Sequence, residues 1–96
     1  MKITIKSFLT LRQLMGNQAK FEMDVDGITL KELLDLLCVK YGKGLKQQIF
    51  DPKTSEIRAL LRVLVNGHHY TTLTDNLETQ LQDGDEISLL PLMVGG

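Results

Sequence analysis

Apolar and polar residues alternate in two segments near the start of the chain. In residues 2–8, Ile3 and Ile5 are separated by polar side chains, a period of two that indicates a strand with one buried face. Residues 19–25 repeat the alternation and predict a second strand. A polar connection that contains glycine, at residues 16–18, precedes the second segment, so we expect the strands to form a hairpin.

A helical pattern follows Thr29. Thr29 and Glu32 match a capping box, in which each side chain satisfies a free backbone N–H of the other residue. Beyond them, apolar residues recur at the spacing of one helical face, and Gly42 and Gly44 are expected to end the helix. The apolar face consists of Leu30, Leu33, Leu34, Leu37, Cys38 and Tyr41.

The second half of the chain predicts shorter elements. The polar segment after the helix favours a short helical turn around residues 45–50 and then a loop. Residues 59–65 are rich in branched side chains and run into Asn66-Gly67, a strong hairpin signal because both residues tolerate a positive φ. A third strand and a short fourth strand, around residues 68–70, should flank this turn.

The last strand is predicted over residues 86–91, after a turn at residues 83–85. Five strands and one main helix favour an α+β fold, in which the amphipathic helix packs on one face of a mixed sheet. This arrangement is the β-grasp, or ubiquitin-like, fold. We therefore expect one β-grasp domain over residues 1–91, followed by a flexible C-terminal tail over residues 92–96.

The composition is that of a small globular protein. The 96 residues are 43% hydrophobic and 24% charged, which suits a single apolar core. Lys and Arg total 11 against 12 Asp and Glu, with no basic stripe, so nucleic acid is not an expected partner. No apolar run approaches the length of a bilayer span, and the chain opens on a strand pattern instead of a signal peptide. We expect a cytoplasmic protein that does not bind membranes.

Residues that usually carry catalysis form no recognisable constellation. The sequence has no glycine-rich phosphate loop, no zinc-ligand spacing and no nucleophile elbow around a serine. His68 and His69 are adjacent on a predicted strand, so their side chains should point to opposite faces and not bind one metal ion together. Cys38 lies on the apolar helix face, where a free cysteine usually packs as a small hydrophobic residue. Neither side-chain catalysis nor a metal site is predicted.

The C-terminal segment is different, because an apolar stretch ends on Gly95 and Gly96. Glycine has no Cβ atom, so it lets the backbone enter a narrow channel. Residues 92–96 would reach about 16 Å when extended, at roughly 3.3 Å per residue. That length is enough to enter a partner's buried active site. The alternative is a frayed terminus that happens to end on two glycines.

Several short segments occur in the order of a known family. They are Phe8, Leu11 to Leu14 with Gly16, Val63 to Gly67, Asp83 to Ile87, and the final Gly95-Gly96. Together with the order of elements, they resemble the MoaD/ThiS family of ubiquitin-like sulfur carriers over the whole chain. This family includes the small subunit of molybdopterin synthase, the thiamin sulfur carrier and small archaeal modifier proteins. The tail differs from the family's common Pro-Pro-Val-(Ser or Ala)-Gly-Gly by having Leu92-Met93-Val94 after Pro91.

The resemblance implies a non-catalytic carrier whose working group is the carboxylate of Gly96. An E1-like adenylating enzyme of the MoeB/ThiF type would use ATP to adenylate this carboxylate, and the carrier itself would bind no cofactor. Attack by a persulfide would lead to a thiocarboxylate. Its sulfur would pass to the large subunit of a synthase in cofactor biosynthesis, such as that of the molybdenum cofactor. Gly95 would allow the backbone to fit into the enzyme's channel. Leu92, Met93 and Val94 would form the tail that the enzyme recognises.

Two other fates of the chain stay open at this point. Attack by a lysine amine on the activated Gly96 carboxyl would join the chain to target proteins as a modifier. A non-covalent ubiquitin-like interaction module would instead bind partners through its sheet and leave the tail unmodified.

A partner-binding surface is predicted on the side of the sheet that faces away from the helix. Phe8, Leu64 and Leu90 belong to strands one, three and five, out of phase with the core positions. An exposed apolar cluster of this kind often marks an interaction site. Leu90 is the first choice, since the family commonly places an aromatic residue there and uses it in docking. The alternative is a bulge after Lys6 that would bury Phe8.

Overall fold

The structure is a computed structural model that describes residues 1–91. In chain order the elements are β1 (Lys2–Ser7), α1 (Leu9–Leu14), β2 (Lys20–Asp24), α2 (Leu30–Tyr41), α3 (Lys43–Ile49), β3 (Leu61–Val65), β4 (His68–His69), the 3₁₀ turns η1 (Tyr70–Thr72) and η2 (Asn76–Glu78), and β5 (Glu86–Pro91).

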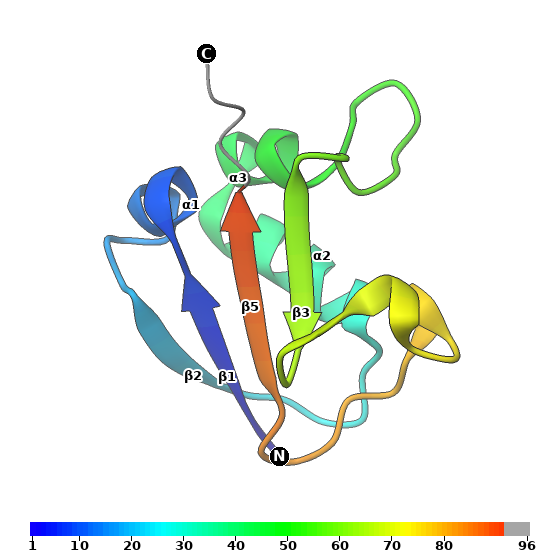
Figure 1. The fold of residues 1–96 in the computed structure, drawn as a ribbon. Helices are drawn as coiled ribbons and strands as arrows, with labels where there is room; N and C mark the ends of the chain where they lie inside the picture. Colours follow the sequence, from blue (N-terminus) through cyan, green and yellow to red (C-terminus); the bar gives the residue numbers. More distant parts are fainter. Residues whose placement is uncertain (92–96) are drawn as a thin grey trace.

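The strands form one mixed sheet in the order β2-β1-β5-β3-β4 (Figure 1). The last strand, β5, lies at the centre, where it runs parallel to β1 and antiparallel to β3. The β1–β2 pair and the β3–β4 pair are antiparallel, as the two predicted hairpins require. Helix α2 packs on one face of this sheet, so the predicted α+β, β-grasp arrangement is confirmed.

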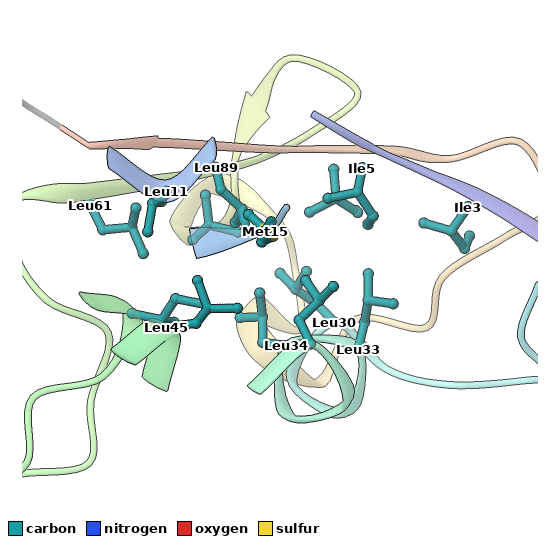
Figure 2. Close-up of a cluster of buried hydrophobic side chains, with 14 of the residues drawn as sticks. Ile3, Ile5, Leu11, Met15, Leu30, Leu33, Leu34, Leu45, Leu61 and Leu89 are labelled. Carbon is teal, nitrogen blue, oxygen red and sulfur yellow. The ribbon is translucent and has the colours of Figure 1, made fainter. Parts of the chain in front are cut away.

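The core lies between α2 and the sheet. Ile3, Ile5 and Leu89 project from the sheet toward the leucines of α2 (Figure 2). Full burial of a leucine or isoleucine side chain contributes about 1.5–3 kcal/mol, so this layer supplies much of the folding free energy. The fully buried members with no exposed surface include Ile3, Ile5, Leu30, Leu33, Leu34, Leu37, Leu45, Val63, Ile87 and Leu89.

A short helix, α1, was not predicted from the alternation pattern. Strand β1 ends at Ser7 instead of residue 8, and α1 lies between this strand and the polar connection predicted at residues 16–18. Leu11 and Met15 lie one helical turn apart and are 1% and 0% exposed, so their burial fixes α1 against the core. Six residues are too few for a helical period to be distinguished from a turn.

Other boundaries differ from the predicted ones by one or two residues. Gly44 lies inside α3, so Gly42 alone ends α2. Gly42 has a φ of 94°, a conformation that favours glycine, and its N–H donates to the carbonyl of Cys38 at 2.8 Å. Tyr70 begins η1 and is not part of β4.

The capping box predicted at the start of α2 is present. The N–H of Glu32 donates to Thr29 Oγ1 at 3.2 Å, and the N–H of Thr29 donates to Glu32 Oε1 at 3.0 Å. Each bond satisfies a backbone donor that the helix itself cannot pair. Residues 1–91 contain no helix with the length and apolar character that crossing a membrane requires.

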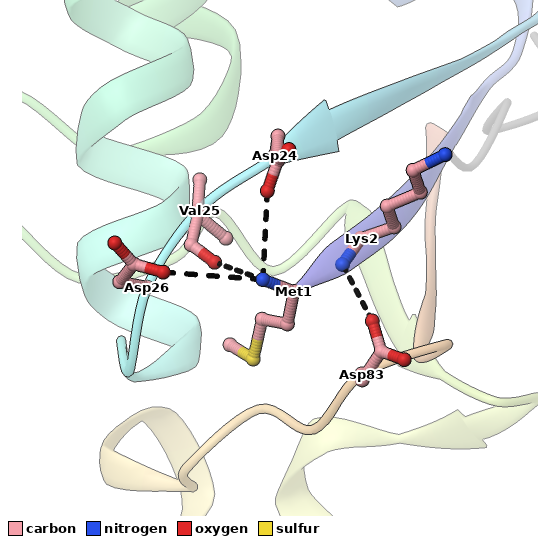
Figure 3. A network of polar contacts seen from close by, with 6 residues as sticks. All are labelled: Met1, Lys2, Asp24, Val25, Asp26 and Asp83. Atoms are coloured by element: carbon pink, nitrogen blue, oxygen red, sulfur yellow. Dashed lines mark hydrogen bonds and ion pairs between the residues drawn. The ribbon is translucent and has the colours of Figure 1, made fainter.

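The start of the chain is tied to two distant segments (Figure 3). The Met1 ammonium donates to the Val25 carbonyl at 2.9 Å and lies 3.4 Å from Asp24 Oδ1. The backbone N–H of Lys2 donates to Asp83 Oδ1 at 2.7 Å. These contacts fix the first residues of β1 between the end of β2 and the turn that precedes β5.

Replacing Thr29 by alanine should lower the free energy of unfolding by about 1 kcal/mol, because the Glu32 N–H loses its acceptor. Urea denaturation measures the loss. Thr10→Ala, at an exposed position of α1, is the control and should change stability by less than about 0.5 kcal/mol. Equal losses in the two variants would contradict the capping role.

Candidate functional site

Strand β5 carries the chain toward its C-terminus from the centre of the sheet. Its inward residues Ile87 and Leu89 have no exposed surface, so the strand is anchored in the core. Pro91 pairs with Leu61 of β3, which keeps the strand in the sheet up to its last residue. The predicted attachment and tail residues, Leu92, Met93, Val94, Gly95 and Gly96, lie outside the described residues.

Leu64 and Leu90 lie on the outer face of the sheet, opposite to α2. Leu90 pairs with Arg62, and Leu64 pairs with Ser88, in the antiparallel ladder between β3 and β5. Leu64 and Leu90 are diagonal neighbours across this ladder, within reach of each other's side chains. Both are partly exposed, and neither belongs to the buried core.

Phe8 lies in the link between β1 and α1. Ser7 pairs with Leu89 and is fully buried, so β1 keeps its alternation to its last residue and has no bulge after Lys6. Phe8 follows with an extended backbone, at φ −132° and ψ 148°, and is partly exposed. The alternative in which a bulge buries Phe8 is therefore wrong.

The outer face carries charged side chains at both ends of β5. Lys6 Nζ and Glu86 Oε1 form an ion pair at 3.1 Å, and each side chain is more than one third exposed. Water screens such a pair, which contributes at most about 1 kcal/mol. Glu86 begins β5, and near the end of the strand the exposed Arg62 pairs with Leu90. Leu90 therefore lies beside a cationic side chain on this face.

A sequence model of the ThiS family matches residues 5–96. The chain belongs to the ThiS family. The match covers more than nine tenths of the 96 residues, so it includes the β-grasp domain and the final glycines together.

Relatives of this ThiS-family protein include carriers and modifiers. A protein of Archaeoglobus fulgidus described as a sulfur carrier is 31% identical over 80 residues, which cover 83% of this chain and 88% of the relative. Small archaeal modifier protein 3 of Haloferax volcanii is 29% identical over 96 residues and is covered completely, as is this chain. The solution structure of small archaeal modifier protein 1 from Methanosarcina acetivorans has a TM-score of 0.80 and 29% identity, covering 99% of this chain and 96% of that one. The predicted family and fold are confirmed, and the protein belongs to a class of small carriers and modifiers.

Cys38 of this ThiS-family protein packs against the core from α2 and is partly buried. Burial raises the pKa of its thiol, and the nearby Asp35 carboxylate raises it further, while Lys46 acts in the opposite direction. A raised pKa lowers the fraction of nucleophilic thiolate at neutral pH. This environment agrees with the structural role predicted for Cys38.

The two histidines lie at the far end of the sheet from the end of β5. His68 is exposed, and His69 Nδ1 lies 2.7 Å from Thr71 Oγ1. Within residues 1–91, no group of three or more His, Cys, Asp or Glu side chains is arranged to hold a metal ion.

Two adjoining pockets, with volumes of about 460 and 370 Å³, open on the helical side of the ThiS-family fold. Both are lined by Asp35, Lys43 and Lys46, and their linings include no residue of β5. The candidate site at the end of β5 is therefore separate from these pockets.

Two exposed leucines near the end of β5 were not among the surface residues predicted from the sequence. Leu9 is 50% exposed and Leu60 is 53% exposed. The strand predicted over residues 59–65 includes Leu60, but β3 begins one residue later, at Leu61. Leu9 follows the end of the first predicted strand, so no alternation pattern covers it.

Leu89 and Leu90 are adjacent but occupy opposite faces of the sheet. Their alanine variants should therefore differ in the free energy of unfolding. Leu89→Ala should lower the free energy of unfolding by about 2–5 kcal/mol, because it leaves a cavity in the core. Leu90→Ala should cost less than about 1 kcal/mol, since its side chain is already partly hydrated. Urea denaturation would contradict the assigned faces if the two losses were equal or reversed.

Proposed function

We propose that this chain is a sulfur carrier whose Gly96 carboxylate is adenylated by an E1-like enzyme and then converted to a thiocarboxylate. The observation that carries the proposal is the ThiS-family match, which runs through the domain to Gly96. The central position of β5 supports it, because this strand holds the start of the tail at a fixed point of the domain. The sulfur carrier of Archaeoglobus fulgidus supports the same class of function.

The chemistry begins with activation of a poor electrophile. A carboxylate oxygen of Gly96 attacks the α-phosphate of ATP and displaces pyrophosphate, which gives an acyl-adenylate. The terminal sulfur of a persulfide then attacks the carbonyl carbon, and AMP leaves with the electrons of the broken C–O bond. The product is an acyl disulfide. A second thiolate of the donor protein attacks the donor's cysteine sulfur in this acyl disulfide and breaks the S–S bond, so a disulfide forms on the donor and the thiocarboxylate leaves with the electrons of the broken bond.

The tail residues have distinct roles in this proposal. Gly95 and Gly96 lack Cβ atoms, so the backbone fits a channel too narrow for other residues. Leu92, Met93 and Val94 provide apolar contacts to the walls of the channel. The thiocarboxylate sulfur then acts as a soft nucleophile toward the substrate of a synthase large subunit in cofactor biosynthesis.

A second candidate function uses the same activated carboxyl. Attack by a lysine amine on the Gly96 acyl-adenylate, or on a thioester formed from it, would give an isopeptide bond to a target protein. The relative named small archaeal modifier protein 3, which matches over the full length of both chains, favours this possibility. The two functions differ only in the nucleophile that attacks after activation.

Phe8, Leu64 and Leu90 form the docking surface for the E1-like enzyme in this proposal. Their partial exposure and their absence from the core support a role outside folding. Since Leu90 lies one residue before Pro91, a protein that binds it is close to the start of the tail.

The carboxylate role is tested by ATP–pyrophosphate exchange with the adenylating enzyme of the source organism. The wild-type chain should support exchange, and a chain with one alanine added after Gly96 should not, because the added residue moves the carboxylate away from ATP. The same alanine inserted in the exposed loop at residues 52–55 is the control and should preserve exchange. Exchange by the extended chain, or none by the wild type, would contradict the proposal.

The docking role is tested by Leu90→Glu in the same exchange assay. A glutamate at position 90 would place a charge inside the interface with the enzyme. This charge should raise the KM for the carrier about tenfold or more, as expected for a residue at the centre of an interface. Leu36→Glu, at an exposed apolar position of α2, is the matched control and should leave KM unchanged. Circular dichroism checks that both variants are folded. An unchanged KM for a folded Leu90→Glu variant would exclude this docking surface.

A further inference from the structure

Leu9 and Leu60 lie on the two sides of the end of β5. Pro91 pairs with Leu61, so Leu60 is the residue next to that pair on the β3 side. Ser7, the last residue of β1, pairs with Leu89 of β5, and Leu9 follows two residues later at the start of α1. Figure 1 shows the start of α1 and the start of β3 on either side of the β5 arrowhead. We refer to Leu9 and Leu60 as the exit leucines.

The backbone of Leu9 has a conformation that leucine disfavours. Its φ is 55°, in the left-handed region where a Cβ atom is crowded by the backbone. The other non-glycine residues with positive φ in residues 1–91 are three asparagines and one serine. Asparagine at position 9 would adopt this φ more easily, and burial does not explain the leucine, because half of its side chain is exposed.

The length of chain after Pro91 limits where a partner can lie. Residues 92–96 span about 16 Å when fully extended. An enzyme that closes its active site around Gly96 must therefore bring its own surface close to Pro91. The residues that meet this surface are those around the end of β5, where the exit leucines lie.

We propose that the exit leucines form an apolar collar that docks onto the rim of the tail channel of the adenylating enzyme. This inference rests on the proposed function and names the partner surface, which is an apolar rim. The collar differs from the docking surface of Phe8, Leu64 and Leu90, because its two residues come from the start of α1 and the turn before β3. Contact on both sides of β5 orients the tail along the channel. The strained backbone of Leu9 holds an apolar side chain at this position.

The test compares Leu9→Asn and Leu60→Ser with Val39→Ser, a control that removes a side chain 84% exposed on α2. ATP–pyrophosphate exchange is measured with the full chain as the varied substrate and the adenylating enzyme of the source organism. Both collar variants should raise the KM for the carrier about fivefold or more and leave kcat unchanged, because docking is lost and chemistry is not. Val39→Ser should leave both constants unchanged.

Thermal unfolding separates docking from structural damage. Leu9→Asn should leave Tm unchanged or raise it by a few degrees, since asparagine tolerates the left-handed conformation. A lower Tm for this variant would overturn the assignment of Leu9.

The outcomes distinguish the collar from the proposed function. Exchange by the wild type with an unchanged KM in both collar variants would overturn the collar and leave the function intact. An equal rise of KM in Val39→Ser would also overturn it, because the effect would not be specific to the end of β5. No exchange by the wild type would overturn the proposed function, and the collar with it.

Discussion

The pairing of β5 between β1 and β3 is the constraint on which the rest of the structure depends. It joins the first and last strands in parallel, with Ile5 opposite Ile87, and places Leu89 beside Val63. Because these inward residues are all fully buried beneath α2, a shift of β5 by one residue would move its apolar side chains to the solvent side. The position at which the chain leaves the sheet is therefore set by the hydrophobic core.

The start of β5 is fixed by hydrogen bonds from residues far away in the sequence. Asn66 Nδ2 donates to Asp85 Oδ1 at 2.9 Å, and the N–H of Glu86 donates to Asn66 Oδ1 at 2.9 Å. Asn66 thus turns the β3–β4 hairpin, with a φ of 52°, and also holds the residue that begins β5. Together with the bond from Lys2 to Asp83, these contacts fix the register of β5 relative to both of its neighbours.

Most of the fold could be predicted from the sequence because its elements bury one face. Alternation located the inward residues of β1, β3 and β5, and the capping box located the first residue of α2. The same phase argument placed Leu64 and Leu90 on the outer face. The order of strands in the sheet comes from the structure, since periodicity does not specify which strands are neighbours.

The parts that were missed lack a periodic signal. Helix α1 depends on tertiary burial of Leu11 and Met15, and its six residues are too few to show a helical pattern. Leu9 begins α1, and Leu60 precedes β3 although the predicted strand included it, so their position near the end of β5 comes from the three-dimensional arrangement. A positive φ at a leucine is also invisible in the sequence, because leucine rarely adopts it.

The domain fixes the start of the tail, and the chemistry assigned to it takes place at the carboxyl of Gly96. The most direct test is the intact mass of the protein purified from its own cells, together with the mass of its C-terminal peptide. The account predicts a form heavier by the difference between one sulfur and one oxygen atom, with the change located at Gly96, or a species joined through Gly96 to a lysine. A population that carries only the unmodified carboxylate, with no lysine-linked species, would contradict it.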